Sequence, residues 1–132
     1  MIYTNSDGGS RGNPGLAAIG VIVRKDNEIL SAYSEKIGET TNNVAEYRAL
    51  IKALELASTH TKDEITCILD SELVVKQLLG EYRVKDYKLR PLFLRVQKLQ
   101  ENFNKVKYLH ARREDKFQKV VDRLLNDEMN NL

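Results

Sequence analysis

Residues 4–15 of the chain read TNSDGGSRGNPG, a segment in which Asp7 is followed by four glycines within eight residues. The residues just before the acid, 2–6, predict a short strand that ends at Asp7. Residues 8–15 are rich in glycine, asparagine and proline, which predicts a loop that is neither helix nor strand. Asp7 is therefore expected at a strand end, beside a backbone that glycine leaves open to close approach.

Outward from this segment, the apolar pattern predicts further strands and helices. Strands are expected at residues 16–24, 28–37, 65–69 and 106–110, the first two forming an antiparallel hairpin around the polar turn 25–27. Helices are expected from a cap at Asn42 or Asn43 to about residue 58, from a cap at Asp70 or Ser71 to near residue 80, over residues 88–102 and over residues 116–129. The order βββαβααβα predicts one α/β domain over residues 1–132, in which a five-stranded mixed sheet carries helices on both faces.

Four acidic residues lie at expected strand ends or helix faces: Asp7, Glu46, Asp70 and Asp122. Asp7 and Asp70 end two strands, which would place their carboxylates side by side at one sheet edge if the strands are parallel neighbours. Singly, Asp7 could open a turn, and Glu46 could complement the dipole in the first turn of its helix. Asp70 could be a helix cap, and Asp122 a solvated helix residue. Together they would repel one another, and a divalent cation such as Mg²⁺ would make the cluster favourable.

Charge is unevenly distributed along the chain. Residues 83–123 hold 13 basic and 5 acidic residues, whereas the net charge of the whole chain is +2. A basic segment in an otherwise acidic chain favours a polyanionic partner, although a solvated, charged helix face explains the same count.

Composition narrows the classes of protein further. The lone cysteine, Cys67, sits in an apolar run and is expected to be a buried, unreactive thiol in a cytoplasmic protein. The sequence contains no run of about 18 apolar residues, and its N-terminus lacks a basic-then-apolar signal. The absence of a Cys/His cluster argues against a zinc site.

Four strings carry a resemblance to a known family. DGGSRGNPG, TTNNVAEYRALIKAL, LDSELVVKQLLGEY and VDRLLN, in this order, resemble the motifs of type 1 ribonuclease H from Thr4 to about Asn126. That family has the same order of elements and hydrolyses the RNA strand of RNA/DNA hybrids with two divalent metals. The resemblance implies four metal ligands, namely Asp7, Glu46, Asp70 and Asp122, with Mg²⁺ as cofactor and Mn²⁺ as a substitute.

The chemistry of phosphodiester hydrolysis agrees with this set. Two divalent metals can activate the attacking water and relieve charge on the leaving 3′ oxygen, which gives 5′-phosphate and 3′-hydroxyl ends. Carboxylates are ligands that suit Mg²⁺ and Mn²⁺.

The substrate-binding residues also follow from the resemblance: Gly8, Gly9, Ser10, Asn13, Thr41, Asn42, Asn43, Ser71, Glu72, Arg112 and Arg113. The glycine-rich segment could approach a minor groove through its backbone, or could form only a tight turn. The Asn42–Asn43 pair could contact nucleic acid, cap a helix, or do both, and by resemblance Thr41 lies near a phosphate of the DNA strand.

The chain departs from the family pattern after its second predicted helix. Glu72 stands where many members have Gln, which adds a negative charge beside the RNA strand. Residues 80–87 are short where many members carry a basic insertion with tryptophans, so the chain resembles the handle-less archaeal and bacterial branch. Arg83, Lys85 and Lys88 are then the candidates for phosphate contacts.

The loop before the last helix is a further departure. It is about two residues longer than the usual pattern, and Gln118 replaces a common Asn. By resemblance, His110 is a candidate for assisting catalysis, and a structural role at the strand end is the alternative. Arg112 and Arg113 could contact the scissile region or be solvated.

The sequence thus predicts a metal-dependent endoribonuclease acting on RNA/DNA hybrids, and we expect a monomer. Two alternatives stay open, a nuclease with additional or preferred activity on RNA/RNA duplexes and a catalytically weak hybrid-binding domain.

Overall fold

The structure is a computed structural model that describes residues 1–112 and 114–131. Its strands are β1 (Ile2–Gly12), β2 (Gly15–Lys25), β3 (Glu28–Thr40), β4 (Glu64–Leu69) and β5 (Lys105–His110). Its helices are α1 (Asn42–Ala57), α2 (Glu72–Leu78), α3 (Arg90–Gln100) and α4 (Lys116–Asn130). The predicted order βββαβααβα is confirmed.

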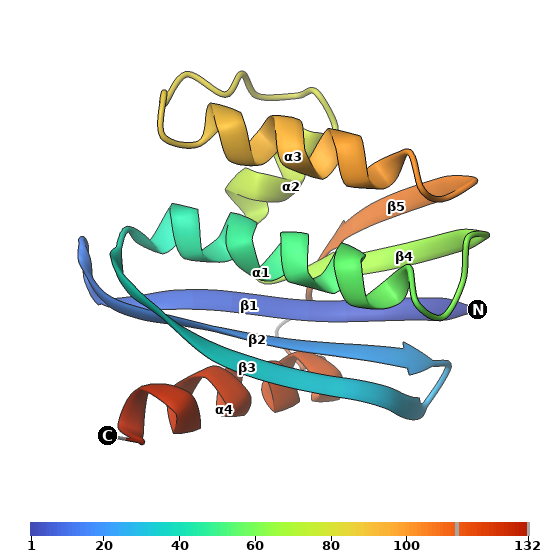
Figure 1. Cartoon of the computed structure of the whole chain (residues 1–132), viewed down its shortest axis with the longest axis horizontal. Helices are drawn as coiled ribbons and strands as arrows, with labels where there is room; N and C mark the ends of the chain where they lie inside the picture. The colour runs from blue at the N-terminus through green and yellow to red at the C-terminus, as the bar shows by residue number, and fades with distance from the viewer. Residues whose placement is uncertain (113, 132) are drawn as a thin grey trace.

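The strands form one mixed sheet in the order β3-β2-β1-β4-β5. β1, β2 and β3 pair in antiparallel fashion, whereas β4 pairs in parallel with both β1 and β5. Figure 1 shows α1, α2 and α3 on one side of this sheet and α4 alone on the other. The predicted five-stranded sheet with helices on both faces is therefore confirmed.

The larger part of the core lies between the sheet and α1. Tyr47, Leu50 and Leu54 of α1 pack with the inward residues of β4, among them Cys67, in one buried cluster. Burial raises the pKa of the Cys67 thiol to about 12, so this cysteine is buried and protonated as predicted.

The predicted loop over residues 8–15 is wrong. β1 continues to Gly12, and its residues pair with β2 from Ile2↔Lys25 through to Gly12↔Gly15. The tight connection is reduced to Asn13 and Pro14. The cross-strand ladder satisfies backbone groups that glycine and asparagine would otherwise leave to solvent, and this pairing overrides the turn propensity of the sequence.

Two predictions about helix starts are also corrected. Thr41, not Asn42 or Asn43, caps α1, because its hydroxyl accepts a hydrogen bond from the Val44 amide at 3.3 Å. Glu46 is the fifth residue of α1 and so lies beyond its first turn. At α2, Ser71 is the cap, as one of the two predicted candidates.

None of the helices in the described part of the chain is long and apolar enough to cross a membrane.

Candidate active site

Parallel pairing of β1 with β4 brings two of the acids together. The register aligns Ser6 with Leu69, so Asp7 and Asp70 are the next residues on neighbouring strands. The structure thus places the two residues side by side as predicted, but Asp7 lies within β1 (Ile2–Gly12) and only Asp70 follows the end of its strand.

Glu46 reaches the same place because α1 lies directly on the β1 backbone. A Cβ at Gly8 would lie 2.1 Å from the carbonyl oxygen of Ala45, a contact that only glycine avoids. This close approach puts the next helical residue, Glu46, beside Asp7. One carboxylate oxygen from each of Asp7, Glu46 and Asp70 lies within 4.8 Å of the other two.

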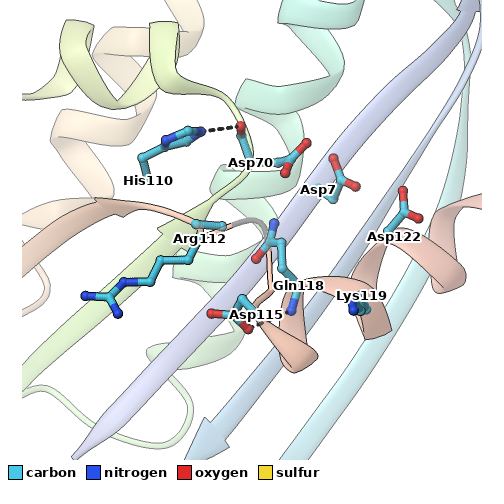
Figure 2. Close-up of a pocket in the computed structure, with 9 residues that line it drawn as sticks. Asp7, Asp70, His110, Arg112, Asp115, Gln118, Lys119 and Asp122 are labelled. Carbon is cyan, nitrogen blue, oxygen red and sulfur yellow. Dashed lines mark hydrogen bonds between the residues drawn. The ribbon is translucent and has the colours of Figure 1, made fainter.

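Asp122 approaches from the opposite side of the sheet. It is exposed on α4 and borders a cavity of about 340 Å³ that Asp7, Asp70 and His110 also line (Figure 2). It is not one of the three acids that group within 4.8 Å of one another. Asp122 therefore stands at the rim of the site, while Asp7 and Glu46 form its buried base.

Burial and mutual repulsion make this cluster electrostatically unfavourable when every carboxylate is ionised. Asp7 and Glu46 are only 6% and 4% exposed. Burial, followed by the charges of Asp70 and Asp122, raises the pKa of Asp7 to about 8. Burial and the charge of Asp7 raise the pKa of Glu46 well above its ordinary value. Protons or cations must therefore balance the cluster near neutral pH.

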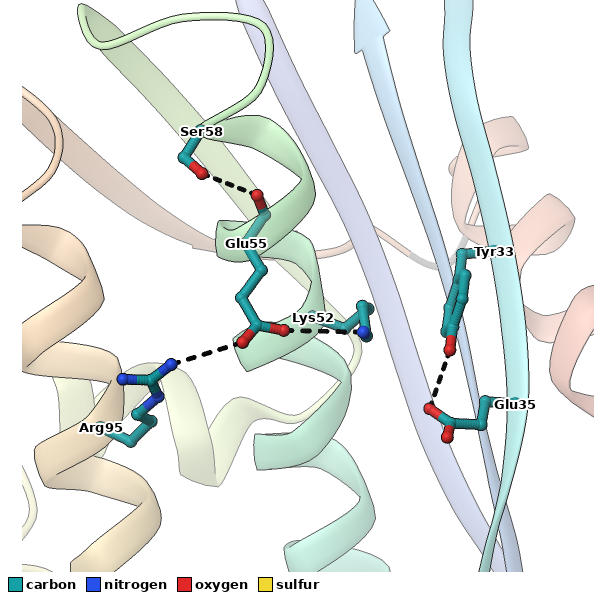
Figure 3. Close-up of polar contacts among 6 residues, drawn as sticks. All are labelled: Tyr33, Glu35, Lys52, Glu55, Ser58 and Arg95. Carbon is teal, nitrogen blue, oxygen red and sulfur yellow. Dashed lines mark hydrogen bonds and ion pairs between the residues drawn. The ribbon is translucent and has the colours of Figure 1, made fainter.

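A polar cluster between α1, α3 and β3 shows the opposite arrangement (Figure 3). Glu55 pairs there with Lys52 at 3.6 Å and with Arg95 at 3.4 Å, and Glu35 accepts a hydrogen bond from the Tyr33 hydroxyl at 3.0 Å. By contrast, the ion pairs found within residues 1–112 and 114–131 include none of the four clustered acids. The site formed by the four acids therefore concentrates negative charge that the described residues do not neutralise.

The raised pKa of Asp7 predicts a pH-dependent stability for the metal-free protein. Its pKa rises from 3.8 to about 8 on folding, so the folded state holds an extra proton between these values and loses stability as pH rises through them. Asp7→Asn should flatten this decline and raise the free energy of unfolding near the upper end of the window by about 1–2 kcal/mol. Urea denaturation in EDTA across the window measures both effects.

The matched control for that experiment is Asp127→Asn, the same chemical change at an exposed position of α4. The control should keep the wild-type slope of stability against pH. An identical slope in Asp7→Asn and wild type would show that Asp7 does not carry the proton.

His110 and Arg112 border the first cavity. The Nε2 atom of His110 lies 3.1 Å from the backbone carbonyl oxygen of Asp70, and because a carbonyl only accepts, the ring nitrogen donates. This bond gives His110 a structural role at the end of β5, and its catalytic role stays a prediction. The guanidinium of Arg112 points away from the carboxylates in Figure 2. Arg113 lies outside the described residues.

A second cavity, of about 280 Å³, borders the same acids and brings together Gly8, Gly9, Ser10 and Asn42. The Asn42 side chain accepts a hydrogen bond from the Ser10 amide at 3.3 Å. The Asn13 side chain in turn accepts a hydrogen bond from the backbone amide of Asn42 at 3.0 Å. These predicted substrate-binding residues therefore form one connected surface beside the carboxylates.

The remaining predicted substrate contacts stand apart from the two cavities, as far as the described residues define them: Thr41, Asn43, Ser71 and Glu72. Thr41 and Ser71 use their hydroxyls as helix caps. Glu72 is exposed and pairs with Lys76 at 2.8 Å, which lowers its pKa. The extra negative charge at this position is thus balanced within α2.

Besides Ala111, three residues of the first cavity were not predicted to belong to the site: Asp115, Gln118 and Lys119. They precede Asp122 by seven, four and three residues, so all lie on its side of α4. Helical spacing from Asp122 was the available signal. By this spacing Gln118, four residues before Asp122, falls on the same helix face.

Comparison with known proteins agrees with this architecture. A family model described as reverse transcriptase-like matches residues 5–127. The crystal structure of LC11-RNase H1 in complex with an RNA/DNA hybrid superposes with a TM-score of 0.91 at 37% identity, covering 98% of this chain and 97% of that one. The chain belongs to the ribonuclease H family. The predicted resemblance from Thr4 to about Asn126 is confirmed.

Curated relatives of this ribonuclease H chain are longer than the chain itself. The bifunctional protein Rv2228c of Mycobacterium tuberculosis is 38% identical over 130 residues, which cover 97% of this chain and 35% of the relative. The ribonuclease HI of Halobacterium salinarum is 42% identical over 113 residues, which cover 85% of this chain and 57% of the relative. The ribonuclease H chain thus spans between a third and three-fifths of these relatives.

Proposed function

We propose that this chain is a divalent-metal-dependent endoribonuclease that hydrolyses the RNA strand of RNA/DNA hybrids. The observation that carries the proposal is the group formed by Asp7, Glu46 and Asp70, whose oxygens lie within 4.8 Å of one another without a cationic partner among the described residues. Repulsion among these carboxylates lowers the stability of the fold unless cations balance their charge. Groups of this kind are found mainly at functional sites.

The donor set fits Mg²⁺ or Mn²⁺. Each residue offers a hard carboxylate oxygen, which is the ligand type that these cations prefer. Asp7, Glu46 and Asp70 would hold the metal at the base of the site, and Asp122 would contribute a carboxylate from the rim. When bound, two divalent ions supply activation of the attacking water and charge relief at the leaving 3′ oxygen, giving 5′-phosphate and 3′-hydroxyl ends.

The protein positions the substrate around this centre. Gly8, Gly9, Ser10 and Asn42 line the second cavity beside the acids, where donors and acceptors can contact the 2′-hydroxyl groups that distinguish RNA from DNA. The crystallised complex of LC11-RNase H1 with an RNA/DNA hybrid supports this choice of substrate.

Phosphate contacts are proposed for the segment between α2 and α3. Arg83, Lys85 and Lys88 are exposed there, and Arg83 and Lys85 share a groove with Tyr82. Exposed cations near a polyanion contribute affinity by releasing counterions, which suits a chain that lacks the longer basic insertion.

A cleavage assay tests the function. End-labelled RNA is supplied as RNA/DNA hybrid, as RNA/RNA duplex and as a single strand, each with Mg²⁺, Mn²⁺ or EDTA. We expect hybrid cleavage with either metal and none with EDTA, because the carboxylates alone provide neither an activated water nor charge relief.

The arms of this assay separate the alternatives. Absence of hybrid cleavage with both metals would refute the enzyme proposal, and retained hybrid binding would then favour a binding domain. Faster cleavage of the RNA/RNA duplex than of the hybrid would overturn the choice of substrate.

A further inference from the structure

A buried chain of polar side chains connects β2, β1 and α4. Arg24 donates from Nε to the side-chain oxygen of Asn5 at 2.9 Å, and Asn5 donates to the side-chain oxygen of Gln118 at 3.2 Å. Gln118 then donates to the backbone carbonyl of Ser6 at 2.7 Å. All three side chains are buried. We call Arg24, Asn5 and Gln118 the Arg24 chain.

Arg24 is fixed at its end of this chain from two sides. Its guanidinium carbon lies 4.4 Å from the centre of the Tyr3 ring on β1 and 4.1 Å from that of Phe117 on α4. The charge of Asp115, whose side chain caps α4, also favours the cation. A single side chain of β2 thus contacts both β1 and the first turn of α4.

Burial of a cation is a costly way to hold a helix in place. Burial lowers the pKa of Arg24, because removal from solvent disfavours the charged form. Apolar residues often stabilise as well as a buried charge of similar size, whereas directional hydrogen bonds select one geometry. The Arg24 chain is therefore better suited to fixing the position of α4 than to adding stability.

The Arg24 chain fixes the position of the Asp122 carboxylate. Gln118 precedes Asp122 by four residues, about one turn of helix, and Ser6 directly precedes Asp7. Figure 2 shows the Gln118 side chain rising from the first turn of α4, with Asp122 farther along the same helix. The hydrogen bond from Gln118 to Ser6 therefore fixes the position of Asp122 relative to Asp7, because Asp122 is one helical turn from Gln118 and Asp7 is the residue after Ser6.

Packing of α4 on the sheet defines the position of Asp122 relative to Asp7 less closely than these hydrogen bonds do. α4 lies directly on Gly20, where a Cβ would come within 2.4 Å of the Val121 carbonyl oxygen, and Gly20 is the cross-strand partner of Asp7. This contact sets the distance of α4 from the sheet. The buried residues Val121 and Leu125 are apolar, and non-directional apolar contact restricts the sliding and rotation of a helix less specifically than hydrogen bonds do.

We propose that Arg24, Asn5 and Gln118 are positioning residues that hold Asp122 in register with Asp7, Glu46 and Asp70. The assignment rests on the proposed function of these four acids as the metal-binding site. It extends that function to a buried network that runs away from the site and ends at Arg24 on β2.

Gln118→Met tests the end of the Arg24 chain that lies at the site, because methionine keeps the approximate volume of glutamine and removes both hydrogen bonds. Gln77→Met is the matched control. Gln77 is also 6% exposed, and it accepts a buried hydrogen bond from the Tyr47 hydroxyl at 2.6 Å, but it lies on α2. Both variants lose buried hydrogen bonding through the same substitution, and only one of them releases α4.

We expect Gln118→Met to lower kcat for hybrid cleavage by about 10-fold to 100-fold, because small misplacements of a catalytic group have effects of this size. KM for the hybrid should change by less than about twofold, since the substrate surface of the second cavity is untouched. The Mg²⁺ concentration for half-maximal rate should rise. Gln77→Met should show none of these changes at matched thermal stability.

Arg24→Met tests the other end of the Arg24 chain, away from the two cavities. It should lower kcat in the same way, and the double variant Arg24→Met/Gln118→Met should be little worse than Gln118→Met alone, because residues of one network are not additive. Independent, multiplying losses in the double variant would show that Arg24 does not act through Gln118.

Hydrogen exchange provides a readout that does not require activity. Amides of α4 from residue 118 to residue 125 should exchange faster in Gln118→Met and Arg24→Met than in Gln77→Met, measured without nucleic acid. Unchanged exchange in both variants would overturn the positioning role even in an active enzyme. If the wild-type protein cleaves no hybrid, the proposed function fails, while faster exchange of α4 would still support the structural link.

Discussion

Asp70→Asn is expected to reduce kcat for hybrid cleavage by at least about 10³-fold while leaving the fold intact. Asp70 is exposed and follows the last residue of β4, so its carboxylate contributes little to the core. An amide has nearly the same shape but is neutral, and its oxygen is a much weaker ligand for Mg²⁺ than a carboxylate. Single-turnover cleavage of a labelled hybrid measures the loss, and urea denaturation measures the stability.

Asp127→Asn again provides the control, since it removes one negative charge from an exposed position outside both cavities. It should retain nearly full activity. Full activity in Asp70→Asn would mean that the group of acids around Asp70 is not the catalytic centre. A large loss of stability in Asp70→Asn would instead show that Asp70 has a structural role.

The second large effect is expected from Gly8→Ala. The added Cβ would lie 2.1 Å from the Ala45 carbonyl oxygen and 2.2 Å from its carbon, both of them backbone atoms that cannot rotate away. We expect the free energy of unfolding to fall by about 3 kcal/mol, because the clash must be relieved by moving α1 away from β1. The same displacement moves Glu46, so the rate of cleavage should fall by about 100-fold in the protein that remains folded.

Gly9→Ala is the matched control for stability. Its added Cβ would meet only side-chain atoms, Leu125 Cδ1 at 3.5 Å and Asn42 Oδ1 at 3.7 Å. We expect a change in the free energy of unfolding of less than about 1 kcal/mol. Equal stability of Gly8→Ala and wild type would refute the argument that glycine is needed for α1 to lie on β1.

Much of the fold could be predicted because local patterns and long-range pairing agree. The apolar run before Asp70 forms β4, and the pattern after residue 115 forms α4. The segment after Asp7 could not be predicted in the same way. Its glycines favour a turn in isolation, and its strand conformation depends on a ladder with β2 that local composition does not encode.

The candidate site shows the same division. The proximity of Asp7 and Asp70 follows from their places after two apolar runs, once the parallel pairing is assumed, although only Asp70 follows a strand end. The depth of Glu46 depends on the contact between Gly8 and Ala45, which is a tertiary feature. The link from Gln118 to Asn5 joins residues 113 positions apart, and no spacing rule within a helix or strand predicts it.

The position of α4 in the chain has a consequence for the timing of synthesis. Asp7, Glu46 and Asp70 all precede α4, whereas Asp122 and the hydrogen bond from Gln118 to Ser6 belong to this last element. A nascent chain lengthens from its N-terminus, so the first eight elements emerge from the ribosome before α4 can pack onto the sheet. The fourth carboxylate is therefore added only after translation has passed residue 122, and until then the growing polypeptide holds three of the four acids of the proposed metal site.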